Sequence, residues 1–182
     1  MIRLSRLLIG RGALNALFGL YFLLAASSSV LRPLQQAGYY FCVDGVLALC
    51  TAYVLLRGRS APWLVSVATA SALARVLLGA WFLLVPELAG QALTGVLVLV
   101  VLSVAAVGLG VGEAVLAFAF GRRSAEFWTV FIAATLAVAA GIALFYVFPD
   151  AAGIRRVFGV YALAFGLLLL SAGLRGAPRA AA

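Results

Sequence analysis

Five side chains capable of proton or ion chemistry lie inside long apolar runs of this sequence. They are Arg11, Asn15, Asp44, Arg75 and Glu113. A charge at the centre of a membrane helix costs about 2.5 to 3.5 kcal/mol on insertion scales, so such residues usually face the interior of a helix bundle and find a partner. Paired carboxylates and guanidinium groups in that setting either form a path for protons or ions, or fix the register of the helices.

The distance of each residue from its nearest helix end places opposite charges at similar depths. Asp44 lies thirteen residues before Arg57, and Arg75 lies thirteen residues after Pro62. At about 1.5 Å per residue, both reach a depth of about 20 Å, and Asn15 reaches about 18 Å. We therefore predict that Arg75 pairs with Asp44 and that Asn15 is the neutral member of their cluster.

A second pair is expected closer to the cytoplasmic end, at a separate level. Arg11 and Glu113 both reach a depth of about 12 to 14 Å. For Arg11 an alternative stays open, because a guanidinium on a long stem this close to the interface can extend to water without a partner. The sequence also leaves open whether either pair is structural or lines a conduction path.

The apolar runs that position these residues define the class of protein. Of the 182 residues, 66% are hydrophobic and 10% are charged, whereas soluble domains have about 45–50% and about 25%. Six segments are long enough to cross a bilayer as helices, and the alternating pattern of an outer-membrane barrel is absent. They lie near Leu7–Ala26, Ala37–Leu56, Trp63–Val85, Val96–Phe120, Phe127–Phe148 and Val157–Leu174. The predicted fold is an all-α, six-helix integral membrane bundle, with one transmembrane domain over residues 1–182 and a short tail at 177–182.

Short connections, one of them predicted at Pro86, indicate that successive helices pack as antiparallel hairpins. One side of the membrane would hold eight arginines: Arg3, Arg6, Arg57, Arg59, Arg122, Arg123, Arg175 and Arg179. The other would hold Arg32, Arg155 and Arg156. The positive-inside rule then places both termini in the cytoplasm of a plasma-membrane protein. A cleaved signal peptide is the competing interpretation of the first segment, but Arg11 and Asn15 within it favour a retained helix.

An internal repeat organises the chain. The stretches ALFGLYFLLAA, VLLGAWFLLVP and VAAGIALFYVFP align on Gly19, Gly79 and Gly141, which are 60 and 62 residues apart. Each is followed by a second apolar segment that ends on arginine, so the unit is a two-helix hairpin over about residues 1–60, 61–124 and 125–176. All three copies start on the same side, unlike the inverted repeats of many secondary transporters.

Other patterns point to packing and to lipid contact. Gly108 and Gly112 form a small-xxx-small pattern, which favours close helix packing within the monomer and leaves an interface of a homo-oligomer as the alternative. Five aromatic residues near helix ends are expected to anchor the chain at the lipid interface: Tyr39, Tyr40, Trp63, Trp81 and Trp128. The scattered arginines do not form a nucleic-acid surface, and no nucleotide, metal or nucleophile motif is present. No cofactor is expected, and neither is enzymatic activity; the expected partner is the lipid bilayer.

The repeated hairpins, each with a glycine, an aliphatic and aromatic run, a spacer and a closing arginine, resemble the short-repeat HdeD-like membrane proteins, a family named for a bacterial acid-resistance protein. The resemblance runs from about Arg11 to Gly176 and is closest over Arg75–Phe118 and Gly141–Leu170. The first copy departs from it, with Ala26 where a proline is usual. The resemblance implies a plasma-membrane protein tied to acid or general stress tolerance through a structural or interaction role, and it supplies no catalytic residues. The alternative function is a small channel or transporter that uses Asp44, Arg75 and Glu113.

Overall fold

The computed structural model describes residues 4–25, 31–57, 61–88, 93–146 and 151–175. This part of the chain forms six long α-helices and one 3₁₀ turn: α1 (Leu4–Leu24), α2 (Leu31–Arg57), α3 (Pro62–Leu88), α4 (Leu93–Ala117), η1 (Phe118–Phe120), α5 (Ala125–Tyr146) and α6 (Ala151–Arg175). Each of the six α-helices is long and apolar enough to cross a membrane. The predicted all-α class and the six spans are confirmed, and the chain is built as a multi-pass membrane protein.

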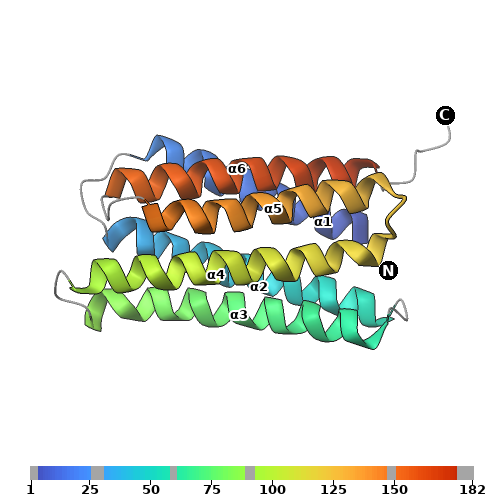
Figure 1. The fold of residues 1–182 in the computed structure, drawn as a ribbon, viewed down its shortest axis with the longest axis horizontal. Coiled ribbons are helices and arrows are strands. Elements are labelled where there is room, and N and C mark those ends of the chain that lie inside the picture. Colours follow the sequence, from blue (N-terminus) through green and yellow to red (C-terminus); the bar gives the residue numbers. More distant parts are fainter. Residues whose placement is uncertain (1–3, 26–30, 58–60, 89–92, 147–150, 176–182) are drawn as a thin grey trace.

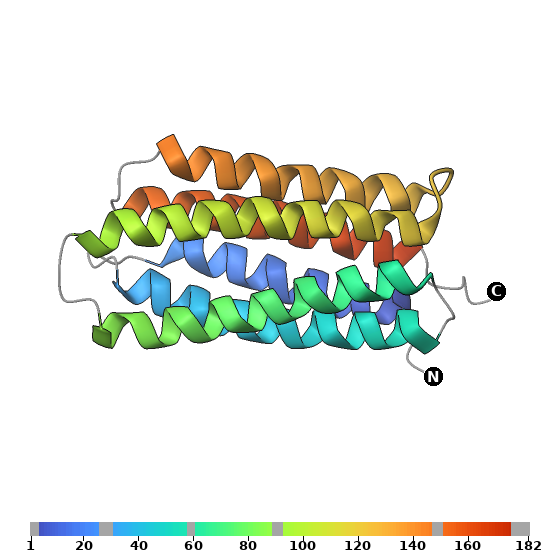
Figure 2. The same cartoon turned by 60° about the horizontal axis from the view of Figure 1, so that its bottom comes forward.

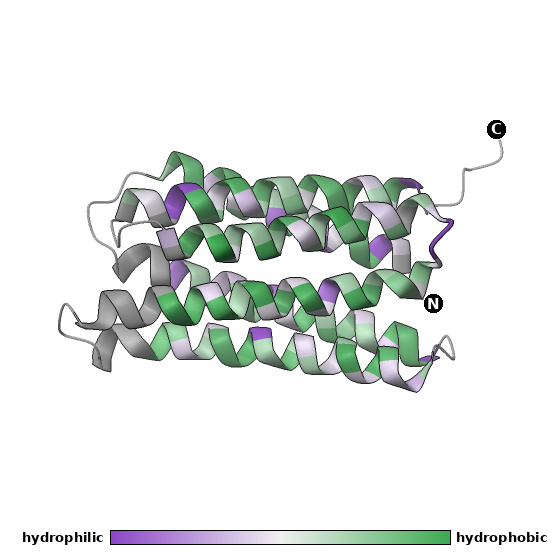
Figure 3. Ribbon diagram, in the orientation of Figure 1, coloured by the Kyte–Doolittle hydropathy of each residue, from purple (hydrophilic) through white to green (hydrophobic). Residues whose placement is uncertain are grey.

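The helices lie side by side along one axis. Helices α1, α3 and α5 run in one direction, and α2, α4 and α6 run in the other (Figure 1). The first turn of α1 and the last turn of α6 lie at the same end of the bundle, and the rotated view shows the same arrangement (Figure 2). Apolar residues predominate along the length of all six helices (Figure 3), and many large apolar side chains are exposed on the outside of the bundle, as lipid contact requires.

Several helix boundaries differ from those predicted; α6, for example, begins at Ala151, six residues before its predicted start, and two of the differences involve proline. Helix α2 begins at Leu31, six residues before the predicted start, because Pro33 sits in its first turn, where a missing backbone N–H breaks no helical hydrogen bond. The predicted turn at Pro86 is wrong, since α3 continues through this residue to Leu88. Proline within the final turn removes one hydrogen bond, which a helix in a packed membrane bundle tolerates.

Three helix pairs, α2–α3, α4–α5 and α1–α6, pack so closely that backbone meets backbone. A Cβ atom built on the central glycines of these pairs would lie 2.7 to 3.2 Å from a carbonyl oxygen of the neighbouring helix. The contacts join Gly38 to Gly79 and Gly45 to Ala72, Ser103 to Gly141 and Gly110 to Ala134, and Gly159 to Gly19 and Gly166 to Gly12. Helices α1 and α6 also meet at Ser5 and Gly173. In every helix successive contact positions are seven residues apart, which is about two helical turns. We call these three contacts the tight seams.

The tight seams do not lie within the predicted hairpins. Those hairpins pair α1 with α2, α3 with α4 and α5 with α6, whereas each tight seam joins helices from two different hairpins. The reason is the direction in which the glycines point: Gly79 on α3, for example, faces Gly38 on the preceding helix and turns away from α4. The first and last helices form a tight seam of the same kind, although the whole chain separates them.

The two glycines predicted to pack helices differ from each other, since Gly112 contacts a neighbouring helix and Gly108 does not. A Cβ atom built on Gly108 would meet nothing within 4 Å, so this glycine lies in no helix contact among the described residues. A Cβ atom on Gly112 would lie 2.9 Å from the Ser71 hydroxyl oxygen on α3, which is a side-chain contact and not a backbone approach. Helix α4 approaches α5 closely at Gly110, which lies between Gly108 and Gly112 in the sequence.

Candidate functional site

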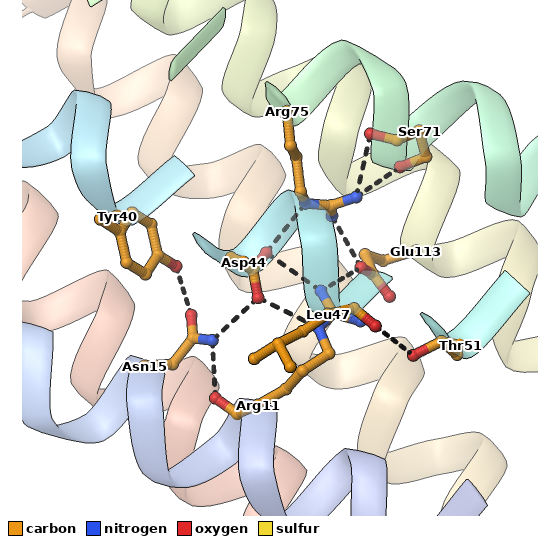
Figure 4. Close-up of polar contacts among 9 residues, drawn as sticks. All are labelled: Arg11, Asn15, Tyr40, Asp44, Leu47, Thr51, Ser71, Arg75 and Glu113. Atoms are coloured by element: carbon orange, nitrogen blue, oxygen red, sulfur yellow. Dashed lines mark hydrogen bonds and ion pairs between the residues drawn. The ribbon is translucent and has the colours of Figure 1, made fainter. Parts of the chain in front are cut away.

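Four helices each contribute one charged side chain to the centre of the bundle. Arg11 comes from α1, Asp44 from α2, Arg75 from α3 and Glu113 from α4, and all four converge on one another (Figure 4). Each is at most 3% exposed. We call these four residues the buried charge network.

Asp44 forms ion pairs with both arginines and accepts hydrogen bonds from Arg11. Arg11 Nε lies 3.0 Å from Asp44 Oδ1, and Arg11 Nη2 lies 3.1 Å from Asp44 Oδ2. Arg75 Nε also lies 3.0 Å from Asp44 Oδ2. This carboxylate therefore neutralises part of the charge of two guanidinium groups from helices on either side of it.

Glu113 closes the network from the opposite side. Its Oε1 accepts from Arg11 Nη2 at 3.0 Å and from Arg75 Nη2 at 2.6 Å. Each arginine thus contacts both carboxylates and each carboxylate contacts both arginines. The formal charges cancel, and the like charges are separated by opposite ones, which limits the cost of burying ions in a medium of low dielectric constant.

Three uncharged side chains, those of Asn15, Tyr40 and Ser71, form further hydrogen bonds around the network. Asn15 donates from Nδ2 to Asp44 Oδ1 at 3.2 Å and to the Arg11 carbonyl oxygen at 2.8 Å. The Tyr40 hydroxyl donates to Asn15 Oδ1. On α3, Arg75 Nη1 donates to the Ser71 hydroxyl at 2.7 Å and to the Ser71 carbonyl oxygen at 3.2 Å. These bonds fix the orientation of the ions, because a side chain held by two or three partners has one accessible rotamer.

The structure brings together all five residues that sequence analysis placed at two levels, a cluster of three and a separate pair. Arg75 contacts Asp44, Asn15 lies beside them, and Arg11 contacts Glu113. The two predicted levels are wrong, however, because Arg11 reaches Asp44 and Arg75 reaches Glu113. The long arginine stems cover the difference in depth. The alternative in which Arg11 extends to water is also wrong, since this residue is 1% exposed.

Two members of the site were not identified from the sequence. Tyr40 was expected at the lipid interface, but it is 2% exposed and holds Asn15 in place. No role was predicted for Ser71, because a serine in an apolar run is common in membrane helices. Both lie four residues before a charged member of the network, Tyr40 before Asp44 and Ser71 before Arg75. A search for polar residues on the same helix face as a buried ion would have found them.

Apolar layers cover the network at both ends. Toward the end of the bundle where α1 stops lie Phe22, Tyr40, Phe41, Phe82 and Phe158, which belong to one packed cluster. Toward the other end lie Leu8, Leu55, Leu116, Phe127 and Leu169. A void of about 20 Å³, lined in part by Arg11, Thr51 and Glu113, adjoins the network on this second side. That volume suits a single water molecule.

Replacing Tyr40 with phenylalanine tests the outer part of the site. The side-chain oxygen of Asn15, Oδ1, would lose its hydrogen-bond donor in a buried position. The free energy of unfolding should therefore fall by about 1 to 3 kcal/mol. Denaturation with sodium dodecyl sulfate in mixed micelles measures this change. Tyr39→Phe is the matched control, because Tyr39 is 61% exposed and its change should leave stability within about 0.5 kcal/mol. Equal effects of the two variants would contradict the role given to Tyr40.

No protein-family model, curated protein or solved structure matches this chain. The resemblance to HdeD-like proteins therefore stays a prediction from the sequence. What the residues establish by themselves is a six-helix membrane bundle with a neutral, enclosed network of four ions at its centre.

Proposed function

We propose that this protein is an HdeD-like plasma-membrane protein that contributes to acid or general stress tolerance through a structural or interaction role. Its termini lie in the cytoplasm, as the arginine distribution indicates. The observation that supports the structural role best is the closed pairing of the buried charge network, in which each ion contacts both ions of opposite sign. Ions held in this way join α1, α2, α3 and α4 and fix their relative register.

Conduction is the alternative function, and the buried ions are the feature that raises it. A conduction path needs a sequence of polar sites that an ion or proton can enter and leave. Here the carboxylates are occupied by arginines, and aromatic and aliphatic layers lie above and below them. These features favour a structural lock over a path.

We further propose that the bundle consists of three copies of one hairpin. The equal spacing of seven residues in all three tight seams supports it. So do the positions of Asn15 and Arg75, which lie four residues before Gly19 and Gly79 respectively. In the third copy the same position is Ala137, which has no polar side chain, so α5 contributes neither an ion nor an amide at this position.

Survival of an acid challenge by a cell that lacks this gene is the test. The deletion strain should survive less well than its parent, and the wild-type gene should restore survival. The double variant Asp44→Leu/Arg75→Met removes one charge of each sign and leaves the Arg11–Glu113 pair, so it should also restore survival if the network is a structural lock.

The same strains separate the two functions. If the double variant is present in the membrane at normal abundance and fails to restore survival, the charges act in function and the structural proposal is wrong. Purified protein in liposomes gives the second measurement, in which the wild type should show no more proton or potassium flux than empty liposomes. An unchanged survival of the deletion strain would contradict the stress role itself.

A further inference from the structure

Two lateral grooves open between helices that share no tight seam. One lies between α3 and α4 and has a volume of about 950 Å³, and the other lies between α5 and α6 and has a volume of about 410 Å³. Both lie within the membrane-spanning segments and open toward the surrounding lipid. Small side chains leave this space, since four of the nine residues that line the α5–α6 groove are alanines.

The α5–α6 groove has a charged residue at one end. Arg156 is the second residue of the α6 span, Arg155–Arg175, and it is exposed. Sequence analysis placed it in a connection, but it belongs to the helix. Val160 and Ala164 follow it at successive intervals of four residues, so the three share one face of α6 and all line the groove. The apolar strip thus runs about 12 Å into the membrane from the arginine.

The neighbouring arginine, Arg155, makes a different contact. Arg155 donates a hydrogen bond to the Ala25 carbonyl oxygen at the end of α1. Arg156 faces the groove instead, and no acidic side chain of the described residues lies within ion-pair distance of it. A guanidinium at the edge of the hydrocarbon region, above an apolar groove, matches the two halves of a phospholipid.

We propose that the α5–α6 groove binds one acyl chain of an anionic membrane phospholipid, whose phosphate pairs with Arg156. A guanidinium binds phosphate through paired N–H donors. The acyl chain contributes only van der Waals packing to binding, because the membrane around the protein is as apolar as the groove. Selectivity among lipids therefore comes from the headgroup, where a basic residue near the membrane surface favours an anionic lipid by about fivefold. This inference rests on the membrane-spanning fold and not on the proposed stress role.

The larger groove is an internal comparison. The α3–α4 groove is lined entirely by uncharged residues, among them Ser71, Trp81 and Gly108. It should accept acyl chains without preference for the headgroup. A difference between the two grooves would trace selectivity to Arg156 and not to the space between helices.

Native mass spectrometry of the purified full-length protein tests the proposal. The protein is exchanged into mixed micelles with equal amounts of palmitoyl-oleoyl phosphatidylglycerol and phosphatidylcholine, and the lipid retained by each molecule is identified. The wild type should retain the anionic lipid about fivefold over the neutral one. Arg156→Gln should remove this preference, and Ala143→Phe, which fills the groove from the exposed α5 side, should abolish retention of that lipid.

A matched charge variant gives the control. Arg122→Gln removes an exposed arginine at the other end of the bundle, where it lies over the Phe118 ring at 5.0 Å and lines neither groove. It should leave the preference unchanged. The proposal is overturned if Arg122→Gln lowers the preference as much as Arg156→Gln does, or if Ala143→Phe retains the lipid normally.

The same spectra identify other occupants. Retention of glycerol 3-phosphate that Arg156→Gln removes and Ala143→Phe leaves intact, with no lipid retained, would show that Arg156 binds a soluble phosphate and that the acyl chain is not required. A dimer that disappears with Ala143→Phe, without any retained lipid, would show that a second copy of the chain fills the groove. Either result would contradict the phospholipid proposal.

Discussion

Replacing Asp44 with leucine should lower the free energy of unfolding by about 3 to 5 kcal/mol, because it removes one member of a buried ion pair and leaves its partners without compensation. Arg11 and Arg75 would then share Glu113 alone, and the site would carry a net positive charge at the centre of the membrane. Denaturation of the purified protein in mixed micelles measures the loss. In cells the same variant should show reduced abundance at an unchanged rate of synthesis.

A second substitution should restore most of that stability. Arg75→Met added to Asp44→Leu removes the excess charge and fills the space with apolar groups of similar length, and Arg11 stays paired with Glu113 at 3.0 Å. Replacement of a buried ion pair by apolar residues is often neutral or stabilising. The double variant should therefore unfold less readily than either single one. Additive losses would mean that the two residues are not energetically coupled, and the network would then not act as a unit.

Replacing Gly166 with alanine should destabilise the bundle by about 1 to 3 kcal/mol, the range for overfilling a packed interior. The added methyl group would lie 2.7 Å from the Gly12 carbonyl oxygen and 2.8 Å from the Ala16 α-carbon, so the backbones of α1 and α6 would have to separate. Thermal unfolding in detergent measures the effect. The change should lower the melting temperature of the whole protein, since this tight seam joins its first and last helices.

Gly108 supplies the matched control for that experiment. The same glycine-to-alanine change there meets nothing within 4 Å, and alanine is the better helix former by about 1 kcal/mol. Gly108→Ala should therefore leave stability unchanged or raise it. A loss at Gly108 equal to that at Gly166 would show that the tight seam has no special demand for glycine.

Composition and helix depth predicted a large part of this molecule. An apolar segment of about twenty residues has few alternatives to a membrane-spanning helix, so the six spans follow directly from the sequence. Distance along a helix also gives depth, which is why Asp44 and Arg75 could be matched. Depth does not reveal how far a side chain extends, and the long stem of Arg11 is what merged two predicted pairs into one network.

It was harder to predict which helices pack against each other, because this depends on the angular position of each residue around its helix axis. Gly108 and Gly110 are two residues apart, which turns them by about 200° around α4. One faces an open groove and the other packs against α5. The sequence contains the glycines but not the identity of the helix that each one faces. For the same reason the hairpins predicted from the repeat are not the pairs of helices that pack most closely.

The tight seam between α1 and α6 has a consequence for biosynthesis. Helix α1 leaves the ribosome before the other five helices, yet its closest neighbour, α6, follows all of them, so the face containing Gly12 and Gly19 stays uncovered until α6 has been inserted. During that interval Arg11 needs a partner in the membrane, and Asp44 on α2 is the first carboxylate to arrive. The ion pair can therefore hold α1 in place while the later helices are inserted, and the glycine contact forms when α6 packs against α1.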